Sequence, residues 1–95
     1  MLQKMGLFNW GGSNIPLYTS GTNASYENLG MVEGMYEYDN NATTQSDAVA
    51  KAKNELRRML SAIKADAAIN VRYCCFPSNN TCTIIVYGDA IKFVK

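Results

Sequence analysis

The chain contains no histidine and almost no net charge. The missing histidine removes the commonest general base, the commonest metal ligand and the usual pH-sensitive side chain. A formal net charge of +1 argues against a surface that neutralises nucleic-acid phosphates. The sequence also lacks an apolar run long enough to cross a membrane as a helix. We therefore expect neither a nucleic acid nor a membrane as a partner.

What is present fits one small globular domain. The 95 residues allow a single modest core, and the 47% hydrophobic content excludes wholesale disorder. The first residues hold one lysine and a short apolar patch around Trp10, without the apolar stretch of about 7–15 residues that a secretory signal needs. We interpret residues 1–14 as a flexible N-terminal arm and residues 15–95 as the domain, and we expect a cytoplasmic location.

The three cysteines, Cys74, Cys75 and Cys82, cannot all pair within one chain. Neighbouring side chains on a strand point to opposite faces, so a bond between Cys74 and Cys75 is disfavoured. A bridge from either of them to Cys82 is geometrically possible if the two positions lie opposite one another in a hairpin. In the cytoplasm, however, the expected state is three reduced thiols.

Apolar residues recur at three- and four-residue spacing over residues 46–64, which predicts an amphipathic helix buried on one side. Thr43, Thr44 and Ser46 are candidate N-caps, and Asp47 places a carboxylate in the first turn, where the helix dipole favours it. The apolar stripe consists of Val49, Ala52, Leu56, Met59, Leu60 and Ile63. The basic residues outside the stripe are interpreted as a solvated helix face: Lys51, Lys53, Arg57 and Arg58.

Alternating patterns predict four strands around this helix. Residues 15–19 and 29–38 precede it, and the second of these contains Gly30 and Gly34, whose spacing indicates close backbone approach or coiling of the sheet. A hairpin follows it, with one strand at about 67–74 and another from residue 81 to 94 that carries a bulge or bend at Gly88. The predicted order is β-β-α-β-β: an α+β single small domain with one helix packed on a mostly antiparallel sheet.

Several of these segments resemble the YbjQ-type family, which is labelled heavy-metal-binding. The resemblance is carried by LGMVEG at 29–34, the helix, KADAAINVRY at 64–73 and YGDAIKF at 87–93. It implies a small α+β domain that often associates into homo-oligomeric rings. One feature departs from the YbjQ-type family: its typical glycine-rich basic insertion is replaced here by DNNATTQ at 39–45. In fold alone, the chain also resembles the lipoprotein sensor of the Rcs envelope-stress pathway.

The cysteines are the first candidate site, because three thiolates brought within about 4 Å of one another bind soft metals. Adjacent cysteines point apart on a strand, however, and the sequence has neither a C-x-x-C spacing nor a histidine to complete a site. Cys74, Cys75 and Cys82 are therefore interpreted as structural cysteines. No metal residue or cofactor is assigned, and a heavy metal ion bound by these three thiols stays the alternative.

Asp66 and Asp89 are the second candidate, as a carboxylate pair for acid–base chemistry. Both precede alanine and follow a turn or break, where aspartate commonly bonds to backbone N–H groups. We interpret them in that way, assign no catalytic residue and expect a non-enzymatic protein.

Aromatic residues are the third candidate: Tyr26, Tyr36, Tyr38, Tyr73 and Tyr87, with Trp10. They fit either an interface or ordinary sheet packing. One helix covers only one face of a sheet, so the other face must meet solvent, another subunit or a ligand. The sequence thus predicts a YbjQ-like binding or assembly domain that forms a homo-oligomer. The alternative is a thiol-based heavy-metal-binding protein.

Overall fold

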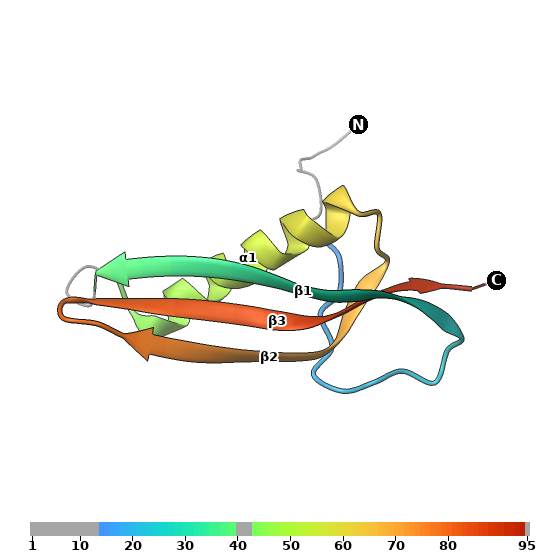
Figure 1. The fold of residues 1–95 in the computed structure, drawn as a ribbon, viewed down its shortest axis with the longest axis horizontal. Helices are drawn as coiled ribbons and strands as arrows, with labels where there is room; N and C mark the ends of the chain where they lie inside the picture. Colours follow the sequence, from blue (N-terminus) through green and yellow to red (C-terminus); the bar gives the residue numbers. More distant parts are fainter. Residues whose placement is uncertain (1–13, 40–42, 95) are drawn as a thin grey trace.

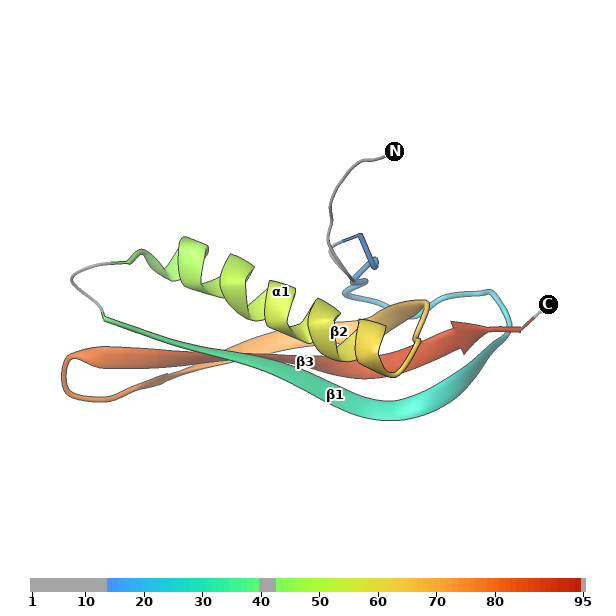
Figure 2. The same cartoon turned by 90° about the horizontal axis from the view of Figure 1, so that it is seen from above.

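One helix lies on one face of a three-stranded antiparallel sheet (Figure 1). The computed structural model describes residues 14–39 and 43–94. Its elements are β1 (Tyr26–Asp39), α1 (Gln45–Ala62), β2 (Ala67–Pro77) and β3 (Thr81–Phe93), and the order in the sheet is β1-β3-β2. Figure 2 shows α1 lying along one side of the sheet. The predicted α+β fold is confirmed, whereas the arm proposed for residues 1–14 lies, except for Asn14, outside the described residues.

The segment at residues 15–19 is not a full strand, so the predicted order β-β-α-β-β is wrong by one strand. The segment forms one parallel bridge, between Leu17 and Ala68, at the edge of β2. The Tyr18 N–H donates to the Ala68 carbonyl at 2.9 Å, and the Ala68 N–H donates to the Pro16 carbonyl at 3.1 Å. Pro16 has no N–H of its own, and Asn70 in β2 has a φ of 55°. Two further hydrogen bonds cross this kink, from the Asn70 N–H to the Ser20 carbonyl at 3.1 Å and from the Val71 N–H to the Tyr18 carbonyl at 2.9 Å, but the bulged backbone keeps them out of a regular strand register.

α1 begins after Thr44, whose hydroxyl accepts a hydrogen bond from the Asp47 N–H at 3.2 Å. This confirms one of the predicted caps. The side chains that face the sheet are buried: Ala48, Ala52, Leu56 and Leu60. Met59 and Ile63, predicted to belong to the buried stripe, are 50% and 43% exposed. The stripe is narrow because the helix lies so close to the sheet that only side chains aimed directly at it are covered.

Gly34 makes this close approach possible. A Cβ atom at this position would lie 2.3 Å from the Leu56 nitrogen and 2.5 Å from the Ala52 oxygen, both in the backbone of α1. Gly30, four residues earlier, has a φ of 107° beside a bulge, and its N–H donates to the Asn28 side-chain oxygen at 2.7 Å. The two glycines thus have the two roles that their spacing predicted, close backbone approach and coiling of the strand.

The bulge predicted at Gly88 lies instead in the neighbouring strand. β3 runs without interruption through Gly88, while the register of β2 shifts between Ile69 and Arg72. A Cβ atom on Gly88 would lie 2.9 Å from the Ile69 oxygen and 2.9 Å from a methyl carbon of Val71. Glycine is required here because the bulged backbone of β2 occupies the space of a side chain.

Candidate functional site

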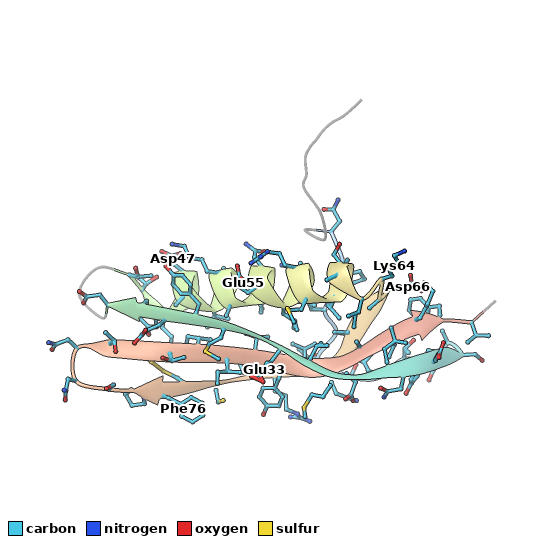
Figure 3. All side chains as sticks on the ribbon, turned by 45° about the horizontal axis from the view of Figure 1, so that its top comes forward. Glu33, Asp47, Glu55, Lys64, Asp66 and Phe76 are labelled. Carbon is cyan, nitrogen blue, oxygen red and sulfur yellow. A yellow bond between two sulfur atoms is a disulfide. The ribbon has the colours of Figure 1, made fainter. Side chains whose placement is uncertain are left out.

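The face of the sheet turned away from α1, here called the outer face, carries alternate residues of all three strands. In Figure 3, Glu33 and Phe76 lie on this side, while Asp47 and Glu55 lie on the helix. No helix or strand within residues 14–39 and 43–94 covers the outer face. The strand register places eleven residues on its open part: Met31, Glu33, Met35, Glu37, Arg72, Cys74, Phe76, Thr83, Ile85, Tyr87 and Asp89.

The outer face carries three exposed apolar side chains, each in a different row of the sheet. Met31 is 72% exposed, and Met35 and Phe76 are each 54% exposed. Met35 pairs with Ile85, which in turn pairs with Cys74, so these three form one apolar row across the sheet. Phe76 follows Cys74 on the same face of β2, whereas the Glu33 row separates Met31 from Met35. Exposed apolar side chains grouped with an apolar row are typical of interaction surfaces in soluble proteins.

The next row combines charge with an aromatic ring. Glu33 on β1 pairs with Tyr87 on β3, and Tyr87 pairs with Arg72 on β2. Glu33 and Arg72 are both exposed and sit on the two outer strands, about 10 Å apart at the usual strand spacing. Among the described residues no ion pair joins them, and the row presents one charge of each sign on the two edge strands of the sheet.

The outer face closes at one end. Ile69 is 2% exposed and Ile91 fully buried, and they cluster there with Ala67 and the half-buried Phe93. Both bulges of the sheet lie near this end, and bulges bend strands. The curvature of β1 there is visible in Figure 2. The open patch therefore extends from the β2–β3 turn to about Asp89.

The structure separates the three cysteines. Cys75 and Cys82 form a disulfide with a Cα–Cα distance of 6.5 Å, whereas Cys74 is free. The expectation of three reduced thiols is therefore wrong for Cys75 and Cys82, because the hairpin register brings their Cα atoms within disulfide range on the helix side of the sheet. Cys74 lies on the opposite face. Among the described residues, no group of three or more Cys, Asp or Glu side chains is placed to hold a metal ion.

The two aspartates do not form a pair. The Asp66 carboxylate accepts a hydrogen bond from the Phe93 N–H at 2.8 Å, and its other oxygen lies 3.9 Å from the Lys92 ammonium. Asp66 thus bonds to backbone as predicted, although to β3 rather than locally. Asp89 lies half-buried on the outer face, between Met31 and Ile69 in the register.

The tyrosines are divided between the two faces, so they do not make one aromatic surface. By register, Tyr26 and Tyr87 belong to the outer face, whereas Tyr36 and Tyr38 lie under the helix. The Lys51 ammonium lies 5.1 Å from the centre of the Tyr36 ring and donates to its hydroxyl at 3.3 Å. Trp10 lies outside the described residues.

A groove between α1 and β2 is a feature that the sequence did not predict. Tyr73, 52% exposed, and Lys53 line both hollows of this groove, which have volumes of about 460 and 140 Å³. The groove depends on α1 lying over β1 and β3 rather than over β2, and the helical periodicity holds no signal for that placement. The only sequence feature that relates to this groove is the aromatic side chain of Tyr73.

Comparison with known proteins adds a likeness in fold. No family model and no curated protein matches the sequence. A solved structure from Pediococcus pentosaceus, described as a protein of unknown function that belongs to the DUF74 family, is similar with a TM-score of 0.75 and 18% identity. The match covers 82% of this chain and 96% of that one. DUF74 is the YbjQ-like family, so the fold agrees with the resemblance seen in the sequence.

The described part of the chain has no helix with the length and apolar character needed to cross a membrane.

Proposed function

We propose that this chain is a YbjQ-like, non-enzymatic domain that acts by binding and assembly, and that it forms a homo-oligomer through the outer face of its sheet. The observation that carries this proposal is the exposure of three apolar side chains on that face, Met31, Met35 and Phe76. Methionine and aromatic residues are enriched at protein interfaces, and burying one such side chain contributes about 1.5–3 kcal/mol.

The charged groups support a binding role over catalysis or nucleic-acid recognition. The Asp66 carboxylate is engaged by a backbone N–H of β3. On the helix, Arg57 donates to the Ile15 carbonyl at 3.1 Å and Arg58 pairs with Glu55, while Lys51 contacts Tyr36. Cations tied to their own chain are poorly placed to neutralise a phosphate backbone.

Size-exclusion chromatography with light scattering tests the proposal. We expect a mass above the 10.5 kDa of one chain, increasing with concentration. Met35→Glu should lower the association, because it places a charge in the apolar row. Met59→Glu is the matched control, since Met59 is exposed to a similar extent, 50% against 54%, but lies on the helix. A protein that stays monomeric at millimolar concentration would overturn the proposal.

The second candidate is a thiol-based heavy-metal-binding protein. Its support is the position of Cys75 and Cys82 on one face of the hairpin, since two thiolates released by reduction would be soft ligands at short range. Metal analysis of the reduced protein, purified without an affinity tag, tests it against a variant with all three cysteines changed to serine. Equal metal content in the two proteins would reject it.

A cytoplasmic location is the accompanying prediction, and the disulfide supplies its test. Disulfides persist in oxidising compartments, and cytoplasmic thiols are kept reduced. Cells are quenched in acid and their thiols alkylated before any oxidation can occur. Three alkylated cysteines per chain would support the cytoplasm, and modification of Cys74 alone would place the protein in an oxidising compartment instead.

A further inference from the structure

The groove between α1 and β2 is the open half of a gap whose other half the chain itself fills. Ile15 and Leu17 pack on the core there, and the Arg57 side chain donates to the Ile15 carbonyl at 3.1 Å. In Figure 1 this first described segment, in blue, lies beside the C-terminal half of α1. Beside the N-terminal half, the gap is open within the part of the chain that the structure describes. We propose that the apolar segment at residues 7–10 (LFNW) folds back and fills the open half.

The direction of the chain favours this arrangement. Leu17 pairs in parallel with Ala68, so residues 15–19 run along β2 toward the groove, and Thr19 lines the smaller hollow. Asn14, which precedes them, lies in a turn. The sequence around it, GGSN at 11–14, has the composition typical of a chain reversal. A reversal here places the preceding residues alongside residues 15–19, over the same gap.

The length of the chain is sufficient. Trp10 precedes Ile15 by five residues, and five extended residues span up to about 17 Å. The hydrogen bond to Arg57 fixes Ile15 at that level of α1. Val49, in the wall of the larger hollow, is eight residues earlier, which is about 12 Å along the helix axis. Trp10 therefore reaches the groove even when the turn takes up part of the length.

The chemistry of the groove suits an aromatic occupant. Its larger hollow has a volume of about 460 Å³, within the range of about 300–1,000 Å³ of sites that hold small organic molecules. Tyr73 lines it and is 52% exposed, so an incoming ring can pack on a ring already in place. Lys53 lines both hollows, and an ammonium group is attracted to the face of an indole ring.

The segment at residues 7–10 is favoured over a separate ligand because it belongs to the same chain. A tethered group meets its site at an effective concentration in the millimolar range. A free ligand of equal affinity would have to match that concentration to displace it. The docking does not involve the outer face of the sheet, so it is independent of the proposed assembly and holds in a monomer.

The fluorescence of Trp10, the only tryptophan of the chain, tests the docking. The full-length protein is excited where tyrosine does not absorb and is quenched with acrylamide, and a peptide of residues 1–14 is the solvated reference. We expect several-fold weaker quenching in the protein than in the peptide, and emission at shorter wavelength. Tyr73→Ala removes the ring that the segment packs on, and Ala50→Glu places a charge at an exposed position of the groove wall. Each should raise the quenching toward that of the peptide.

Phe76→Ala is the matched control. Phe76 is 54% exposed, against 52% for Tyr73, and lies on the opposite face of the same strand, so its removal should leave the quenching of Trp10 unchanged. Circular dichroism verifies that each variant is folded.

Three outcomes would overturn the proposal. Wild-type quenching equal to that of the peptide would show that Trp10 is solvated. Weak quenching that persists in both Tyr73→Ala and Ala50→Glu would place the segment elsewhere on the domain. Protection that is lost on dilution, together with a fall in mass measured by light scattering, would assign the groove to the segment of a second copy. None of these outcomes bears on the outer face, which the association of Met35→Glu tests separately.

Discussion

The two faces of β3 differ although their residues alternate along one strand. On the helix side, Ile84 and Val86 are fully buried, whereas Ile85 and Tyr87, on the outer side, are only half-buried. A strand with one solvated face normally alternates apolar and polar residues, and a strand covered on both faces has a continuous apolar run. The run from Ile84 to Tyr87 is of the second kind, but within residues 14–39 and 43–94 a helix covers only one of the two faces. The sequence of β3 is therefore suited to a second layer that would cover its outer side.

The faces also differ in the side chains they use. The helix side of the sheet meets α1 through small residues, among them Gly34 and Ala52, which fix one close and rigid arrangement. The outer face carries Met31 and Met35, whose unbranched side chains adapt to different surfaces. Tight packing on one side holds the domain together, whereas the side chains of the outer side are free to adapt in shape.

The largest expected difference between the faces is in stability. Leu56→Ala removes a fully buried side chain under the helix and should lower the free energy of unfolding by about 3 kcal/mol. Met35→Ala, on the outer face, should lower it by less than about 0.5 kcal/mol in dilute, monomeric protein. Urea denaturation followed by circular dichroism measures both. Similar losses at the two positions would mean that the outer face belongs to the core of the monomer.

The second prediction concerns the close packing of the helix on the sheet at Gly34. Gly34→Ala places a methyl group 2.3 Å from the Leu56 backbone nitrogen and should cost about 2–3 kcal/mol, because neither backbone can move without disturbing its hydrogen bonds. Gly21→Ala is the control, since a Cβ atom there would meet nothing within 4 Å. Equal midpoints in urea for both variants would show that α1 yields easily and that the covered face is not rigid.

Local patterns in the sequence were enough to predict much of this fold. The helix period located α1 and its Thr44 cap, and alternation located three of the four predicted strands. The segment at residues 15–19 has strand-like alternation, yet its hydrogen bonds to β2 run across the kink at Asn70 and include only one bridge of regular geometry. Such a kink results from the packing of two strands and leaves little trace in local composition.

The candidate site depends more on register than on residue type. Alternation alone left open whether Cys74 or Cys75 bonds to Cys82, because a shift of one residue moves every side chain to the other face. The bulge between Ile69 and Arg72 is one of the features that set this register. The sequence predicted an uncovered face, but the row that joins Glu33 to Arg72 exists only once both strand pairings are known.

The disulfide, which lies on the helix side only, should have a third and somewhat smaller effect on the free energy of unfolding. Cys75 and Cys82 close a short loop, with a sequence separation of 7, on the helix side. Reduction should lower the free energy of unfolding by about 2 kcal/mol, because the unfolded chain regains the entropy of that loop. Urea denaturation with and without a reductant measures the effect. The Cys74→Ser variant, changed on the outer face, should lose as much on reduction as the wild type, and a Cys75→Ala/Cys82→Ala variant should not respond. A response in the last variant would trace the effect to something other than this bond.

The smallest expected effect concerns the border between the open and closed parts of the outer face. Asp66 accepts the N–H of Phe93 at 2.8 Å, and Phe93 packs on the buried cluster that closes this end. Asp66→Ala should lower the free energy of unfolding by about 1 kcal/mol, the usual net value of one hydrogen bond. Asp66→Asn keeps an acceptor oxygen for the same N–H and should lose about half as much or less, and hydrogen exchange at the Phe93 amide distinguishes the two variants directly. Equal protection of the Phe93 amide against exchange in the two variants would mean that pairing with β1, and not the Asp66 carboxylate, protects it. The curvature of the sheet alone would then determine where the open patch ends.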